Sequence, residues 1–115
     1  MNRRIEKINE VLRREIGQLI LENIDFGRKI LITVNRVDVA PDLSEAKVYV
    51  SVLPDSFIND ILPVLRRRSV IFHKMLNKVM RIRKVPRLNF CEEKNLQKAA
   101  HIDELLHRID NNKAR

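Results

Sequence analysis

The sequence predicts a single α+β domain, in which two helical regions flank a pair of strands and a short third strand follows. Two observations carry this prediction: an apolar stripe at helical spacing in residues 3–24, and strict apolar–polar alternation in residues 46–52. The length of 115 residues suits one domain, and the hydrophobic fraction of 44% is enough for one modest core.

The first element is an amphipathic helix over residues 3–24. Its apolar residues recur at spacings of three and four, which places them on one face: Ile5, Ile8, Leu12, Ile16, Leu19 and Ile20. Asp25 and Phe26 follow, and Gly27 is placed as the helix stop.

Two strands come next. Residues 30–39 are rich in β-branched and apolar side chains, and residues 41–44 carry turn chemistry. In the strand that follows, one face carries Ala46, Val48, Val50 and Val52, and the other carries Lys47, Tyr49 and Ser51. This alternation indicates a half-buried strand, and the two strands should form an antiparallel hairpin.

A second helical region begins by about Asp60, with Pro63 tolerable only near its start. Its apolar stripe consists of Ile61, Leu65, Phe72, Met75, Leu76, Val79 and Ile82. The apolar spacing is interrupted at Arg68 and Ser69, which predicts two helices or one kinked helix. Val85-Pro86 ends the helical pattern.

A short third strand is expected over residues 88–91, and a last helix over residues 98–110. The apolar stripe of that helix consists of Ile102, Leu105, Leu106 and Ile109. The predicted organisation is therefore a domain over residues 1–97 and a C-terminal helix with a polar tail over residues 98–115.

The net charge of +8 is concentrated in one segment. Residues 61–91 contain no Asp or Glu and nine basic side chains, whereas the remainder holds 14 basic and 15 acidic residues. A solvated helix face is the ordinary explanation of a charge run, but such a face normally mixes signs. An acid-free segment instead favours a surface that faces phosphate.

Helical phasing narrows the surface further. Successive residues of a helix are rotated by about 100° around its axis. By this rotation, one sector of about 60° contains Arg67, Lys74, Lys78 and Arg81, and it lies about 120° from the centre of the apolar stripe. Tyr49 is the one aromatic candidate on an exposed strand face, so recognition by shape and phosphate is expected rather than base stacking. The predicted RNA-binding residues are Arg66, Arg67, Arg68, Ser69, Lys74, Lys78, Arg81, Arg83, Lys84 and Arg87, with Arg3, Arg4 and Lys47 as secondary contacts.

Other functional classes find little support. No segment approaches the roughly 20 apolar residues of a membrane span, and the N-terminus lacks a signal-peptide pattern, so a cytoplasmic protein is expected. Cys91 is the single cysteine, and His73, His101 and His107 are scattered without metal-ligand spacing. His73 is expected to contact phosphate or solvent. No nucleophile or P-loop motif occurs, so neither catalysis nor a cofactor nor a metal is expected.

Two sequence blocks carry a family resemblance. Residues 39–51 read VAPDLSEAKVYVS, and residues 76–90 read LNKVMRIRKVPRLNF. Both blocks, in this order, resemble bacterial ribosome-binding factor A, and the likeness extends over nearly the whole chain. The resemblance implies a type II KH-like fold with a mixed three-stranded sheet and helices packed on one face.

The resemblance also implies a function. Such a protein binds the free or immature 30S ribosomal subunit, assists late 16S rRNA folding and 5′-end processing, and supports growth in the cold. It implies no catalytic activity, no cofactor, no small-molecule substrate and no membrane, and we expect a monomer. One departure stands out: Arg68-Ser69-Val70 occupies the place of the family's alanine–glycine kink between two central helices.

Two alternatives remain open at this point. A basic second helix after a helix break would also suit a helix-turn-helix DNA-binding module. The stripe in residues 102–109 would suit a protein-binding module. Competition between duplex DNA and rRNA, titrated at physiological salt, distinguishes DNA binding from RNA binding. Proteolysis that removes the residues after about 97 tests whether the stripe in residues 102–109 packs on the domain.

Overall fold

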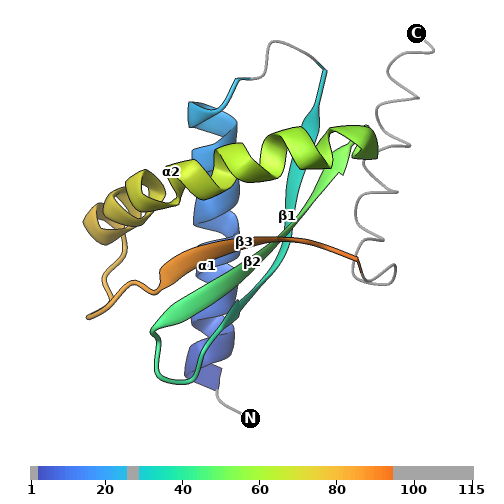
Figure 1. Cartoon of the computed structure of the whole chain (residues 1–115). Coiled ribbons are helices and arrows are strands. Elements are labelled where there is room, and N and C mark those ends of the chain that lie inside the picture. The colour runs from blue at the N-terminus through green and yellow to red at the C-terminus, as the bar shows by residue number, and fades with distance from the viewer. Residues whose placement is uncertain (1–2, 26–28, 95–115) are drawn as a thin grey trace, which may run out of the picture.

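The structure is a computed structural model that describes residues 3–25 and 29–94 (Figure 1). Its elements in chain order are α1 (Arg3–Asn23), β1 (Leu31–Val39), β2 (Glu45–Leu53), the 3-10 turn η1 (Asp55–Phe57), α2 (Ile58–Val79) and β3 (Arg87–Glu92). The strands form one sheet in the order β1-β2-β3, in which β1 and β2 are antiparallel and β2 and β3 are parallel. The predicted α+β fold with a mixed three-stranded sheet is confirmed.

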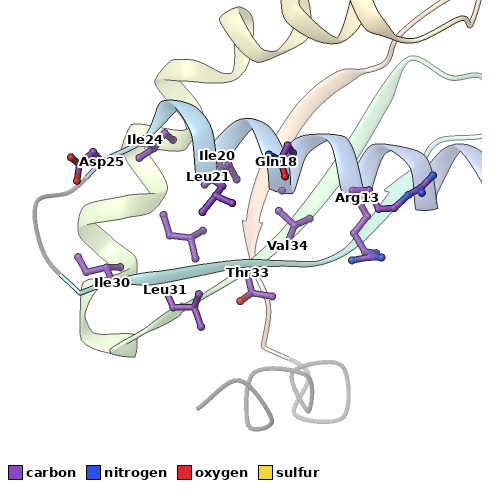
Figure 2. A pocket seen from close by; sticks show the side chains of 13 residues that line it. Arg13, Gln18, Ile20, Leu21, Ile24, Asp25, Ile30, Leu31, Thr33 and Val34 are labelled. Carbon is purple, nitrogen blue, oxygen red and sulfur yellow. The ribbon is translucent and has the colours of Figure 1, made fainter. Parts of the chain in front are cut away.

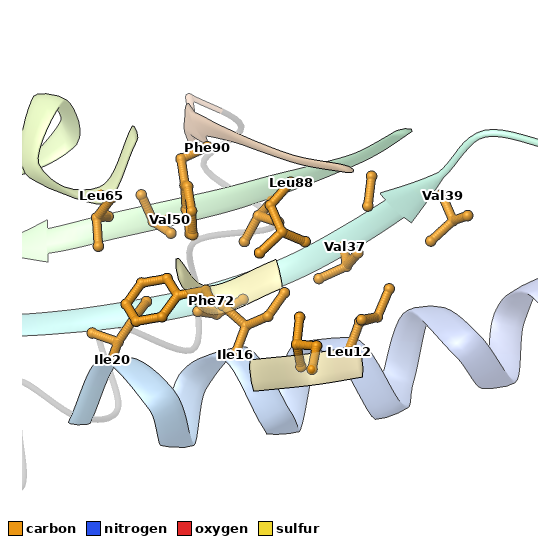
Figure 3. Close-up of a cluster of buried hydrophobic side chains, with 14 of the residues drawn as sticks. Leu12, Ile16, Ile20, Val37, Val39, Val50, Leu65, Phe72, Leu88 and Phe90 are labelled. Atoms are coloured by element: carbon orange, nitrogen blue, oxygen red, sulfur yellow. The ribbon is translucent and has the colours of Figure 1, made fainter. Parts of the chain in front are cut away.

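Both helices contribute to one core on one face of the sheet (Figure 3). Helix α1 packs mainly against β1, and α2 packs mainly against β3. The helices bury Ile8, Leu12, Ile16, Ile20, Ile61, Leu65, Phe72 and Leu76 against alternate residues of the three strands. Phe72 of α2 meets Phe90 of β3 edge to face, with ring centroids 6.3 Å apart. This contact and the burial around it fix α2 over the β3 side of the sheet.

Strand β1 contains a bulge that explains its apolar spacing. Val34 and Val37 are both buried although they are three residues apart, because the register with β2 shifts between Val34 and Arg36. The extra residue, Asn35, donates from Nδ2 to the Ser51 Oγ at 2.6 Å. The bulge turns the later half of β1 so that its valines return to the core face.

The hairpin turn uses the residues that the sequence placed there. The Leu43 amide donates to the Ala40 carbonyl at 2.8 Å, and Leu43 has a φ of 61°. The Asp42 carboxylate accepts from the amide and hydroxyl of Ser44. Proline and aspartate thus set a tight turn that closes the β1–β2 hairpin.

Of the two possibilities predicted at Arg68-Ser69, a pair of separate helices is wrong: α2 is one helix from Ile58 to Val79. Leu65 and Phe72 are separated by seven residues, about two helical turns, so the apolar stripe continues on one face of this helix. The Ser69 hydroxyl donates to the Arg66 carbonyl at 2.8 Å, within the same helix. The skip in the apolar pattern therefore marks the edge of the buried face.

The ends of this helix also differ from the prediction. Pro63 lies inside α2, further from its start than expected, and the carbonyl four residues earlier belongs to Asn59, which is exposed to water. Met80 is extended, so the predicted stripe member Ile82 lies beyond the helix, although it still packs against the core. Val79, expected in the core, is 62% exposed. The predicted C-terminal helix and the boundary at residue 97 lie outside the described residues.

Candidate nucleic-acid interface

The acid-free segment, residues 61–91, occupies three consecutive parts of the fold: α2 from Ile61 onward, the connection over residues 80–86, and β3 up to Cys91. Its nine basic residues are all exposed: Arg66, Arg67, Arg68, Lys74, Lys78, Arg81, Arg83, Lys84 and Arg87. Within residues 3–25 and 29–94, none of them forms an ion pair with a carboxylate. Their charges are therefore available to a phosphate-bearing partner.

The outward face of α2 carries part of this charge. Ile61, Leu65, Phe72 and Leu76 hold one side of the helix in the core, and Arg67, Lys74 and Lys78 lie on the opposite side. The phasing prediction is confirmed for these three cations. It is wrong for Arg81, because α2 ends two residues earlier.

Two of the predicted RNA-binding residues on α2, Arg66 and Ser69, also form hydrogen bonds within the protein. Arg66 donates from Nε to the Phe90 carbonyl at 3.2 Å, which ties α2 to β3, and it remains exposed. The Ser69 side chain is half-buried and its hydroxyl is bonded within the helix. These bonds restrict both side chains, so Arg67, Lys74 and Lys78 are the freer contacts of this helix.

His73 has a structural contact that the sequence did not reveal. Its Nε2 lies 2.8 Å from the Val85 carbonyl, and its Nδ1 lies 3.4 Å from the Asn77 Nδ2. A carbonyl can only accept, so Nε2 carries a proton and Nδ1 is left as an acceptor in the neutral ring. The half-buried ring therefore has a structural role besides the expected contact with phosphate or solvent, since it bonds α2 to the basic connection.

The connection after α2 is anchored by its apolar residues. Val85 and Pro86 are buried, and the Arg87 amide donates to the Ser44 carbonyl at 3.1 Å. Arg81, Arg83 and Lys84 are exposed around this anchor. The pKa of Asp42 is lowered mainly by its hydrogen bonds from Ser44, with a smaller electrostatic contribution from Lys84, so this cation lies near the hairpin turn.

Not all predicted cations share one face. Alternation in the strands places Lys47 and Arg87 on the side of the sheet opposite the helices, where Lys47 pairs across strands with Asp38. Lys47 is therefore next to an acid and separate from the α2 surface. The structure does not join it to the main basic face.

Arg4, a predicted secondary contact, lies beside the basic connection that follows α2. Arg4 and Lys7 of α1 line a groove of about 370 Å³ together with Arg81, although the two segments are far apart in sequence. Lys7 was missed by the sequence reasoning, but its spacing of three from Arg4 is the signal that places both on one helix face. Arg3 is exposed and does not line this groove.

One face of the Tyr49 ring is covered by a neighbouring cation. The Arg36 guanidinium carbon lies 3.7 Å from the centroid of its ring, and the Arg36 Nε donates to the Glu93 carboxylate. One face of the only tyrosine is thus covered by a cation that is itself held in place. This arrangement leaves at most one face of the ring for a base, and recognition by shape and phosphate stays a prediction.

A second groove, of about 650 Å³, lies between α1 and β1 (Figure 2). Its lining is mostly aliphatic, and its ionisable side chains are Arg13, Arg14 and Asp25. This set offers no activated nucleophile. Within the described part of the chain there is no cluster of three potential metal ligands. Among those residues, no helix is long and apolar enough to span a membrane.

The continuous α2 also bears on the DNA-binding alternative. A helix-turn-helix module needs two helices joined by a short turn, and the second helix enters the major groove. That alternative relied on a break at Arg68-Ser69, which the structure replaces with uninterrupted helix. The alternative thereby loses its structural basis.

Comparison with known proteins gives a consistent result. Residues 4–106 match the family model described as ribosome-binding factor A. A Desulfitobacterium hafniense ribosome-binding factor A is 38% identical over 107 residues, covering 92% of this chain and 86% of the relative. The crystal structure of ribosome-binding factor A from Thermus thermophilus aligns with a TM-score of 0.68 and 26% identity, covering 76% of this chain and 93% of that chain.

A second structure from Thermus thermophilus is also similar to this chain. It is a Thermus thermophilus ribosome-binding factor A homology model fitted into the cryo-EM map of a 30S-RbfA complex. It aligns with a TM-score of 0.62 and 28% identity, covering 72% of this chain and 88% of that chain.

Proposed function

The chain belongs to the ribosome-binding factor A family, and from this premise we propose that it binds the 30S ribosomal subunit through 16S rRNA. One observation carries the proposal beyond the family name: the exposed basic side chains of α2 and residues 81–84, which lie in a segment, residues 61–91, without Asp or Glu. Cations on an outward helix face neutralise backbone phosphates without reading sequence.

The proposal places recognition on Arg67, Lys74 and Lys78 of α2 and on Arg81, Arg83 and Lys84 of the connection. Arg66, Arg68 and Arg87 flank this set. We further propose that binding occurs on free or immature subunits, assists late rRNA folding and 5′-end processing, and supports growth in the cold. The protein would act as a cytoplasmic monomer without a cofactor, a small-molecule substrate or catalysis of its own.

Charge reversal tests the assignment of the surface. Arg67, Lys78 and Arg81 are replaced together by Glu, and binding is measured by co-sedimentation with purified small subunits. Three reversals replace attraction by repulsion at the proposed phosphate contacts, so co-sedimentation should be abolished. The circular dichroism spectrum should be unchanged, because all three side chains are exposed.

A matched triple variant controls for net charge. Arg14, Lys29 and Lys94 are also exposed and lie outside the acid-free segment. Their replacement by Glu changes the net charge equally and should leave co-sedimentation largely intact at physiological salt. Retained binding by the first variant, or equal loss by both variants, would refute the site assignment.

A further inference from the structure

The groove between α1 and the chain after α2 combines an apolar floor with a cationic end. Its floor is formed by Ile8, Val11, Val79, Met80 and Ile82, and its charged rim by Arg4, Lys7, Glu15 and Arg81. Val79 is 62% exposed, so an apolar side chain at the end of α2 is open to a ligand in this groove. The groove is continuous with the basic surface because Arg81 belongs to both.

The charges are ordered along α1. Arg4, Lys7, Val11 and Glu15 are spaced by three and four residues and share one helix face. At about 1.5 Å per residue, the eleven steps along the helix from Arg4 to Glu15 span about 16 Å. The groove therefore has cations at one end, aliphatic side chains in the middle and one carboxylate at the other end.

We propose that this groove receives a single unpaired RNA base, with the adjoining phosphate held by Arg4, Lys7 and Arg81. The inference rests on the proposed function and specifies the chemistry of the RNA that it involves. Unstacked bases are bound between aromatic or apolar side chains, and their polar edges are read by hydrogen bonds. Glu15 is placed to accept a hydrogen bond from an exocyclic amino group, as carboxylates do from cytosine.

Two observations favour a nucleotide over a protein segment in this groove. The rim carries three cations from two separate segments against one carboxylate, and one of these cations, Arg81, belongs to the segment of residues 61–91 that contains no Asp or Glu. The chain's own apolar stripe at residues 102–109 is a less suitable occupant. The groove adjoins residues 79–82, which precede β3, whereas the chain leaves the far end of β3 at Lys94 before it reaches the stripe.

The test compares two RNA hairpins that differ by one bulged adenosine in the stem. Affinities for the full chain are measured by fluorescence anisotropy at one salt concentration. The unaltered chain should bind the bulged hairpin about ten-fold more tightly, a typical effect for one bound base. Val79→Ser should reduce this preference to near unity, because it replaces an exposed apolar side chain of the groove floor with a polar one.

Val70 provides the matched control. It is also a valine on α2 with 63% exposure, but it does not line the groove. Val70→Ser should keep the ten-fold preference even if the overall affinity changes. Loss of the preference in both variants would overturn the proposal.

Other outcomes separate this inference from the proposed function. Equal affinity of the unaltered chain for the two hairpins, with co-sedimentation on small subunits intact, overturns the base site alone. Loss of co-sedimentation contradicts the proposed function. A lower melting temperature of the Val79→Ser variant with an unchanged RNA preference would mean that the chain itself covers the groove, and would also overturn the base site.

Discussion

The Arg36 Nε of β1 donates at 2.8 Å to the Oε2 of Glu93, the residue that follows β3, and the Glu93 side chain is only 1% exposed. The same guanidinium stacks on Tyr49 of β2. Three strands are thereby bonded on the face that the helices leave open. Hydrogen bonding to Glu93 and the nearby negative charge raise the pKa of Arg36, so this cation is charged throughout the accessible pH range.

Replacing Arg36 by Met keeps an unbranched apolar chain and removes the charge. The buried Glu93 carboxylate then loses its ion pair with Arg36, and we expect a loss of about 2 kcal/mol in the free energy of unfolding. Urea denaturation measures this loss. Arg13→Met is the control: Arg13 is equally exposed at 35%, but its partner Glu10 is 57% exposed, so a change below about 0.5 kcal/mol is expected. Similar small effects in both variants would contradict a stabilising role for the Arg36–Glu93 pair.

Gly17 lies in the interior of α1, where glycine is unfavourable. A Cβ built at this position meets no atom within 4 Å, so no contact within the chain requires its absence. Gly17→Ala should raise the free energy of unfolding by about 1 kcal/mol, because alanine lowers the backbone entropy of the unfolded chain. The midpoint of urea denaturation measures this gain. A lower midpoint would show that the space beside Gly17 is occupied in solution.

Asp42 should titrate below its usual range, since hydrogen bonds from Ser44 stabilise its charged form. A lowered folded-state pKa means that the hairpin turn gains stability above the unfolded pKa and loses it as the pH falls through the folded value. Carboxyl-detected NMR should show a higher pKa for Asp42 in Ser44→Ala, which removes the strongest of these hydrogen bonds. An unchanged pKa would mean that the backbone amide and nearby charge suffice.

Salt dependence tests whether Lys74 contacts phosphate. Each phosphate contact contributes about 0.7–0.9 to the slope of log affinity against log salt. Lys74→Gln should lower the slope for rRNA binding by about that amount, whereas Lys29→Gln, outside the acid-free segment, should leave it unchanged. Affinity measured at four or more salt concentrations gives both slopes. Equal slopes for Lys74→Gln and the unaltered chain would remove this residue from the interface.

The fold was largely predictable because its signals are local. Alternation around Val48 and the helical stripe around Leu12 each reflect one element and one buried face. The bulge at Asn35 was not predictable, since it depends on the register with β2. Likewise, the groove that Arg4 and Arg81 both line depends on how α1 packs beside the end of α2. Such tertiary relationships have no periodic signature in the sequence.

Ser69 is the position where the sequence pattern and the structure disagree, and an alanine–glycine pair of variants tests which is right. In a continuous helix, Ser69→Ala should be more stable than Ser69→Gly by about 1 kcal/mol, the usual difference between these residues inside a helix. A kink that needs a left-handed residue would reverse the order, because glycine adopts positive φ at little cost. Urea denaturation of both variants gives the difference directly. Greater stability of the glycine variant would restore a break between two helices, and with it a different direction for the cations that precede and follow Ser69.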